Sequence, residues 1–81
     1  MDTAAFRQWL LERGLGQRSA GDVCSRLNRV VGLVDIGVIK SKADLEVAFI
    51  RSSAVQALTV SVRSQLKRAA VLWLEFQGAR Q

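Results

Sequence analysis

The stretch GLGQRSAGDVCSRLNRVVGLV, residues 14–34, decides the fold, because its pattern is that of a capped helix with one apolar and one basic side. Ser19 is expected at the N-cap, and Asp22 follows three residues later, an approximate capping box for the unpaired first-turn N–H groups. Apolar residues then recur at helical spacing and predict a buried stripe of Val23, Leu27, Val30 and Val34. Arg26 and Arg29 are three residues apart on another side of the helix. The segment therefore predicts a helix that presents positive charge.

The segments on either side of this helix also favour helical structure. A first helix is expected from Thr3 to Arg13, capped by Thr3 and stopped by two glycines, with Phe6, Trp9 and Leu10 facing inward. The second helix is expected to end near Gly32. The apolar segment LVDIGVI, residues 33–39, lacks helical periodicity, and we interpret it as a buried connection in preference to a short extended segment.

The second half of the chain predicts two further helices and a short helical turn. Ser41 and Asp44 have the spacing of a cap, and the helix that they open turns one side inward, with Leu45, Ala48, Phe49 and Ser52. A break at Ser52 and Ser53 precedes a turn through Val55 and Leu58. Either Thr59 or Ser61 caps the last helix, whose apolar stripe is Val62, Leu66, Ala69, Ala70, Trp73 and Phe76. Residues 1–81 are thus expected to form one compact all-α bundle with four main helices and a short fifth.

Composition and charge narrow the function classes. The chain has 81 residues, 49% of them hydrophobic, and a formal net charge of +5 that is spread along its length. Such a charge favours acidic partners: nucleic acid, an anionic membrane surface or an acidic protein face. The N-terminal segment lacks the pattern of a signal peptide, and the longest apolar region is too short to span a bilayer, so a cytoplasmic protein without a membrane partner is expected.

The residue types present give little support for catalysis. Histidine and tyrosine are absent, so no Ser-His-Asp or Cys-His arrangement can form. Cys24 is the single cysteine, which excludes an intrachain disulfide and zinc sites that need several thiols, and we interpret it as a core thiol. Asp44 and Glu46 are two positions apart on a helix and do not face each other. We therefore expect no enzymatic activity, cofactor, metal or small-molecule substrate.

A second basic patch is predicted on the last helix, where Arg63 and Lys67 are four residues apart with Arg68 beside them. Either patch could instead be a solvated helix flank, and Asp22, one turn before Arg26, is a plausible salt-bridge partner for that arginine. Exposed aromatic side chains beside arginines would suggest stacking on single strands. Trp9 and Trp73, however, fall on the sides that we expect to be buried.

Over nearly its whole length, the chain resembles the N-terminal SAM-like, core-binding domain of phage integrases, the tyrosine recombinases. The matching residues are Phe6, Trp9, Leu10, Gly14, Leu15, Ser19, Val23 and Leu27. The closing segment SVRSQLKRAAVLWLEF, residues 61–76, is similar to the last helix of that domain. The resemblance implies a SAM-like fold that grips one side of duplex DNA with basic helices. It does not carry recombinase activity, because the catalytic Arg, His and Tyr set has no counterpart in this chain.

Two function classes follow. In the first, the chain is a DNA-binding module that contacts phosphates through Arg26, Arg29, Arg63, Lys67 and Arg68, with duplex DNA as the partner. In the second, it is a non-enzymatic protein–protein interaction module, such as a phage-encoded inhibitor or an oligomerising adaptor. The apolar segment at residues 33–39 would support the second class if its side chains Leu33, Ile36 and Val38 are exposed.

Overall fold

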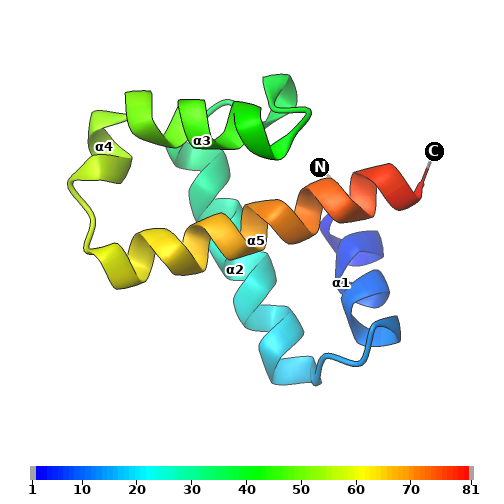
Figure 1. Ribbon diagram of the computed structural model, residues 1–81. Coiled ribbons are helices and arrows are strands. Elements are labelled where there is room, and N and C mark those ends of the chain that lie inside the picture. The colour runs from blue at the N-terminus through cyan, green and yellow to red at the C-terminus, as the bar shows by residue number, and fades with distance from the viewer. Residues whose placement is uncertain (1, 81) are drawn as a thin grey trace.

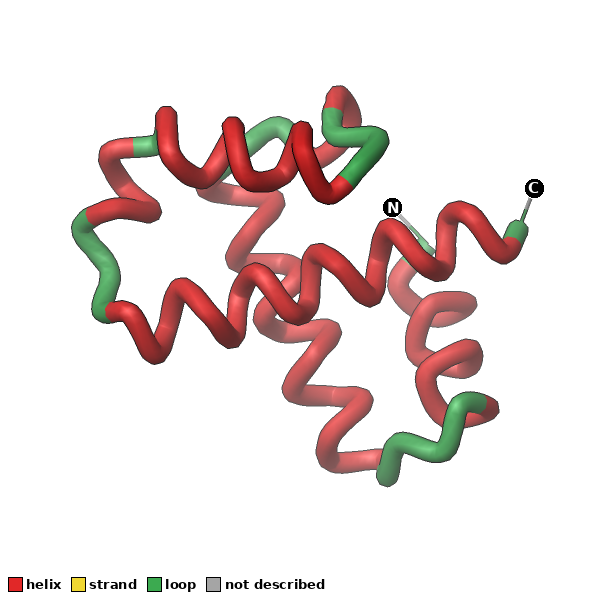
Figure 2. Tube along the Cα trace, in the orientation of Figure 1, coloured by secondary structure: helices red, strands yellow, loops and turns green. Residues whose placement is uncertain are grey.

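Five α-helices and one 3-10 helix build the fold in a computed structural model that describes residues 2–80. They follow in the order α1 (Thr3–Glu12), α2 (Gln17–Leu33), the 3-10 helix η1 (Ile36–Val38), α3 (Lys42–Arg51), α4 (Ser53–Gln56) and α5 (Val60–Ala79). Figure 2 shows helices and loops and no strand in the part of the chain that is described. The all-α fold with four main helices and a short fifth is therefore confirmed.

The two long helices α2 and α5 form the centre of the molecule. In Figure 1, α5 crosses in front of α2, with α1 near the C-terminal part of α5 and α3 and α4 at the other end. The Cα atoms span 34 × 27 × 17 Å. The shortest of these extents fits two stacked layers of helices, whose axes pack about 8–10 Å apart.

The core is divided into two clusters, and both long helices contribute to each. The aromatic cluster lies among α1, α2 and the C-terminal part of α5; its buried members are Phe6, Leu10, Ala20, Val23, Cys24, Leu27, Ala69, Trp73 and Phe76. The aliphatic cluster lies among the end of α2, α3, α4 and the first part of α5; its members are Val30, Ile39, Leu45, Phe49, Val55, Leu66 and Ala70. The core stripes predicted for both long helices are confirmed, although Val34 and Val62 are only half-buried.

Side-chain caps begin four of the five α-helices, α1, α3, α4 and α5, and the caps of α3 and α5 agree with the sequence. Ser41 Oγ accepts from Asp44 N at 3.2 Å, and Asp44 Oδ2 accepts from Lys40 N at 3.0 Å. Thr59 caps α5 by accepting from Val62 N, which decides between the two predicted caps. The cap predicted for α1 is wrong. Asp2, one residue before Thr3, accepts from Ala5 N, as a carboxylate at a helix N-terminus does favourably.

The start predicted for α2 is also wrong, and the error affects the basic surface. The helix begins at Gln17, with Gly16 as its N-cap and no side-chain cap, so Ser19 and Asp22 lie inside the helix. The preceding turn explains this. Gly14 adopts φ 95°, a conformation that favours glycine, and Gly16 is already extended, so helical geometry starts directly after it.

The apolar segment at residues 33–39 is buried only in part, so the interpretation of a buried connection holds only in part: Asp35, Gly37 and Val38 are exposed. Asp35 Oδ1 accepts from Gly37 N and starts the single turn of η1. Ile39 is 4% exposed, and Leu33 and Ile36 are half-buried against the core clusters. Of the surface predicted for protein contact, Leu33, Ile36 and Val38, only Val38 is exposed, at 69%. The prediction of an exposed apolar surface in this segment is therefore wrong for the other two side chains.

Candidate nucleic-acid interface

The outward side of α2 carries three arginines, which we call the α2 arginine face: Arg18, Arg26 and Arg29. Arg29 follows the fully buried Leu27 by two residues, which places it about 200° around the helix axis, and Arg18 is about 180° from Leu27. Both side chains are exposed, and Arg26 is half-buried at the edge of the face. The opposite, apolar side of α2 packs into both core clusters, so this face points into solvent.

The expected ion pair between Asp22 and Arg26 does not form. Between residues 2 and 80 the side chains make two ion pairs, Arg13–Glu75 and Lys67–Glu46. An exposed pair four residues apart contributes only about 0.3–0.5 kcal/mol, which is too little to hold two flexible side chains together. The three arginines of the α2 arginine face are therefore without an ionic partner within the described chain.

Arg63, on α5, takes part in a hydrogen-bonded chain that joins three helices. Its Nη1 donates to Gln56 Oε1 at 2.9 Å, and Gln56 Nε2 donates to the carbonyl oxygen of Phe49 at 2.9 Å. These bonds connect the first turn of α5 to α4 and to the end of α3. Arg63 thus holds helices together, and its guanidinium is less free to meet a ligand than the sequence suggests.

Lys67 is also engaged within the protein. Its Nζ forms an ion pair with Glu46 of α3, and both side chains are more than 40% exposed. A pair as exposed as this contributes roughly 0–1 kcal/mol, so it reduces the charge that Lys67 presents without burying it.

Arg68 lies on another side of α5, in a shallow hollow that we call the α5 groove. The groove is lined by Arg13, Ser64, Lys67, Arg68, Val71, Leu72 and Glu75. Arg13 reaches it from the end of α1 and pairs with Glu75 at 3.2 Å. Arg68 itself is exposed and makes no ion pair within residues 2–80.

The two predicted patches do not merge into one surface. Arg68 follows Leu66 by two residues, just as Arg29 follows Leu27, so each arginine lies about 200° from a leucine of the core. Since α2 and α5 pack against each other through their apolar sides, helical geometry directs Arg29 and Arg68 toward opposite sides of the molecule. Figure 1 shows the two helices one in front of the other, with α5 nearer the viewer.

Both tryptophans belong to the core, as predicted from their helical positions. Trp73 is 7% exposed, and its ring lies edge-on to Phe6 with 5.3 Å between the ring centroids. Trp9 is half-buried, stacks on Phe6 and is covered by the Arg13 guanidinium, 4.6 Å from the ring centroid. Neither indole therefore offers an open face for a base.

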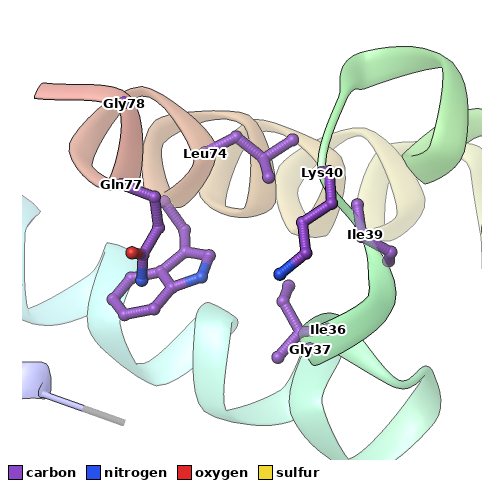
Figure 3. A pocket seen from close by; sticks show the side chains of 8 residues that line it. Ile36, Gly37, Ile39, Lys40, Leu74, Gln77 and Gly78 are labelled. Atoms are coloured by element: carbon purple, nitrogen blue, oxygen red, sulfur yellow. The ribbon is translucent and has the colours of Figure 1, made fainter. Parts of the chain in front are cut away.

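A second hollow, of about 560 Å³, separates the η1 segment from the C-terminal part of α5 (Figure 3). Its walls are formed by Ile36, Gly37, Ile39, Lys40, Trp73, Leu74, Gln77 and Gly78. Lys40 and Gln77 extend into it from opposite walls (Figure 3). The lining contains no carboxylate, hydroxyl or thiol side chain, and Lys40 is its one ionisable residue.

The thiol of Cys24 lies on the inward side of α2, in the aromatic cluster. Burial raises the pKa of this thiol, and the positive charge of the neighbouring Arg7 offsets only part of that rise. Because the thiolate is the reactive form, this environment suits a core side chain better than a nucleophile.

The structure adds two basic residues that were not predicted. Arg18 joins the α2 arginine face because the helix begins two residues before Ser19, and Arg13 reaches the α5 groove from α1. The first had a signal in the sequence: Arg18 and Arg29 are eleven residues apart, close to three helical turns. The second depends on how α1 packs against α5, which no local pattern reveals.

No group of three or more metal-ligating side chains occurs within residues 2–80, and no helix in that range is long and apolar enough to cross a membrane. No protein-family model matches the chain, and no curated protein or solved structure matches it either.

Proposed function

We propose that the protein is a small DNA-binding module whose α2 arginine face docks on the phosphate backbone of a duplex. The observation that carries the proposal is the set of three arginines on one side of α2 without an ionic partner in residues 2–80. Asp22 is the one acidic residue between Arg18 and Arg29. The SAM-like resemblance to the core-binding domain of tyrosine recombinases supports duplex DNA as the partner. Recombination is not part of the proposal.

The length of the face suits a duplex backbone. Eleven residues separate Arg18 from Arg29, which is about 16 Å along the helix axis. This is about half of the 34–36 Å helical turn of B-DNA, so one face could reach several phosphates. Contacts of this kind fix position without reading sequence, and we expect binding that is strong at low salt and weakly dependent on DNA sequence.

A salt titration tests the proposal. Three phosphate contacts predict a slope of about −2.7 in log K against log salt for an unrelated duplex. The double variant Arg26→Ala/Arg29→Ala should flatten the slope by about two units. A matched control, Lys42→Ala/Arg51→Ala, removes the same charge from exposed positions on α3 and should change the slope less. Undetectable binding of the wild-type chain at 20 mM salt, or equal effects of the two double variants, would contradict the proposal.

Self-association through α3 is the second candidate, because two exposed apolar side chains lie together on that helix. Val47 and Ile50 are three residues apart on the side opposite Leu45 and are 46% and 68% exposed. A second copy of the chain could cover these two side chains, because exposed apolar patches often mark protein–protein interfaces. Light scattering of the wild type and of Ile50→Lys tests this: a dimer that becomes a monomer in the variant supports self-association, and a wild-type monomer at high concentration removes it.

A further inference from the structure

We propose that one molecule of this protein bridges two DNA duplexes, one on the α2 arginine face and one on the α5 groove. This inference rests on the proposed DNA-binding function and adds a second partner of the same kind. Arg29 and Arg68 each follow a buried leucine of their own helix by two residues. Because the apolar sides of α2 and α5 face each other in both core clusters, helical geometry directs the two arginines to opposite sides of the molecule.

The α5 groove provides the second set of phosphate-binding groups. Arg13, Lys67 and Arg68 line it together with the hydroxyl of Ser64. Two of the three cations are paired with carboxylates, Arg13 with Glu75 and Lys67 with Glu46, and all four of these side chains are at least 40% exposed. Such exposed ion pairs are weak, so closely spaced phosphates can compete with the carboxylates for Arg13 and Lys67. Arg68 has no ion pair that a phosphate would need to displace.

The thickness of the molecule allows two duplexes to lie on it at once. The shortest Cα extent is 17 Å, and side chains add to the distance between ligands on the two faces. Repulsion between phosphates is screened over about 10 Å at 0.1 M salt, so the two duplexes are separated by more than a screening length. At 0.01 M salt the screening length is about 30 Å, and the second duplex should be repelled. Bridging is therefore tested near 0.1 M, where the repulsion between the two duplexes is screened.

Capture of a second duplex tests this inference separately from DNA binding itself. One duplex is fixed to a surface, saturated with protein at 0.1 M salt and washed, and a labelled free duplex is then added. The wild type should capture the label. Each one-face variant, Arg29→Glu or Arg68→Glu, should still bind the fixed duplex and should lose at least about tenfold in capture. Lys42→Glu makes the same change of charge at an exposed position on α3 and should capture the label like the wild type.

The outcomes separate the two proposals. If the wild type does not bind the fixed duplex, the proposed function fails. If it binds but captures no second duplex, the bridging inference alone is overturned. Undiminished capture by either one-face variant also overturns the bridging inference. Such a result would mean that two copies of the protein associate through another surface and that each copy binds one duplex with the same face. A mixture of the two one-face variants should not restore capture, since no single molecule in it has both faces.

Discussion

The helices α2 and α5 follow the same plan and differ in what their cations do. Both contribute buried side chains to the two core clusters, and both place an arginine two residues after a core leucine. On α2 the three arginines have no ionic partner in residues 2–80, whereas on α5 Arg63 bonds to Gln56 and Lys67 pairs with Glu46. The difference comes from the neighbours: α3 and α4 flank the first half of α5, and the outward side of α2 faces solvent. The cations of a basic stripe are therefore available to a ligand from the outset only where no neighbouring helix engages them.

The largest expected effect concerns the core, to which both α2 and α5 contribute buried side chains. Leu27→Ala in the aromatic cluster and Leu66→Ala in the aliphatic cluster should each destabilise the protein by about 2–5 kcal/mol, because both leucines are at most 1% exposed. Urea unfolding followed by circular dichroism measures the loss. Val60→Ala, at a 69% exposed position, is the control and should remain within about 0.5 kcal/mol of the wild type.

The same variants also show whether the two clusters unfold together. Tryptophan fluorescence reports on the aromatic cluster, where Trp9 and Trp73 lie, and circular dichroism reports on all helices. Because α2 and α5 run through both clusters, Leu66→Ala should lower the midpoints of both signals equally. A fluorescence midpoint that stays at the wild-type value would show that the clusters are independent.

Local patterns in the sequence predict most of the fold. The stripe positions of α2 and α5 follow from helical periodicity, and the cap of α3 follows from the spacing of Ser41 and Asp44. The start predicted for α2, at Ser19, is wrong, because a favourable N-cap residue does not act as a cap once a glycine turn has already begun the helix. The sequence shows which side chains are charged and on which side of a helix they lie. It does not show that Glu46 and Gln56 reach α5, since these contacts arise from packing between helices distant in the chain.

The next largest effect concerns the hydrogen bonds that connect Arg63 through Gln56 to the carbonyl oxygen of Phe49. Arg63→Met keeps most of the aliphatic stem and removes the bond to Gln56, and it should cost about 1 kcal/mol of stability. Arg68→Met, where no hydrogen bond or ion pair is lost, is the matched control and should change stability by less than about 0.5 kcal/mol. A double-mutant cycle with Gln56→Leu isolates the pairwise contribution, which should be about 0.5–1.5 kcal/mol. Additive losses would mean that the two side chains do not stabilise each other.

The smallest expected effect comes from removing the ionic partner of Lys67, which would leave this cation of α5 unpaired like the arginines of α2. Glu46→Gln removes the carboxylate that pairs with Lys67, and stability should fall by less than about 1 kcal/mol because both side chains are exposed. The freed ammonium can then meet a phosphate, so if a duplex also docks on the α5 groove, the salt slope of DNA binding should steepen by up to about one unit. Glu46→Gln also raises the net charge by one, and the same change in a Lys67→Met background measures that effect alone. An equal change of slope in both backgrounds would show that net charge, and not the release of Lys67, controls binding on this side of the molecule.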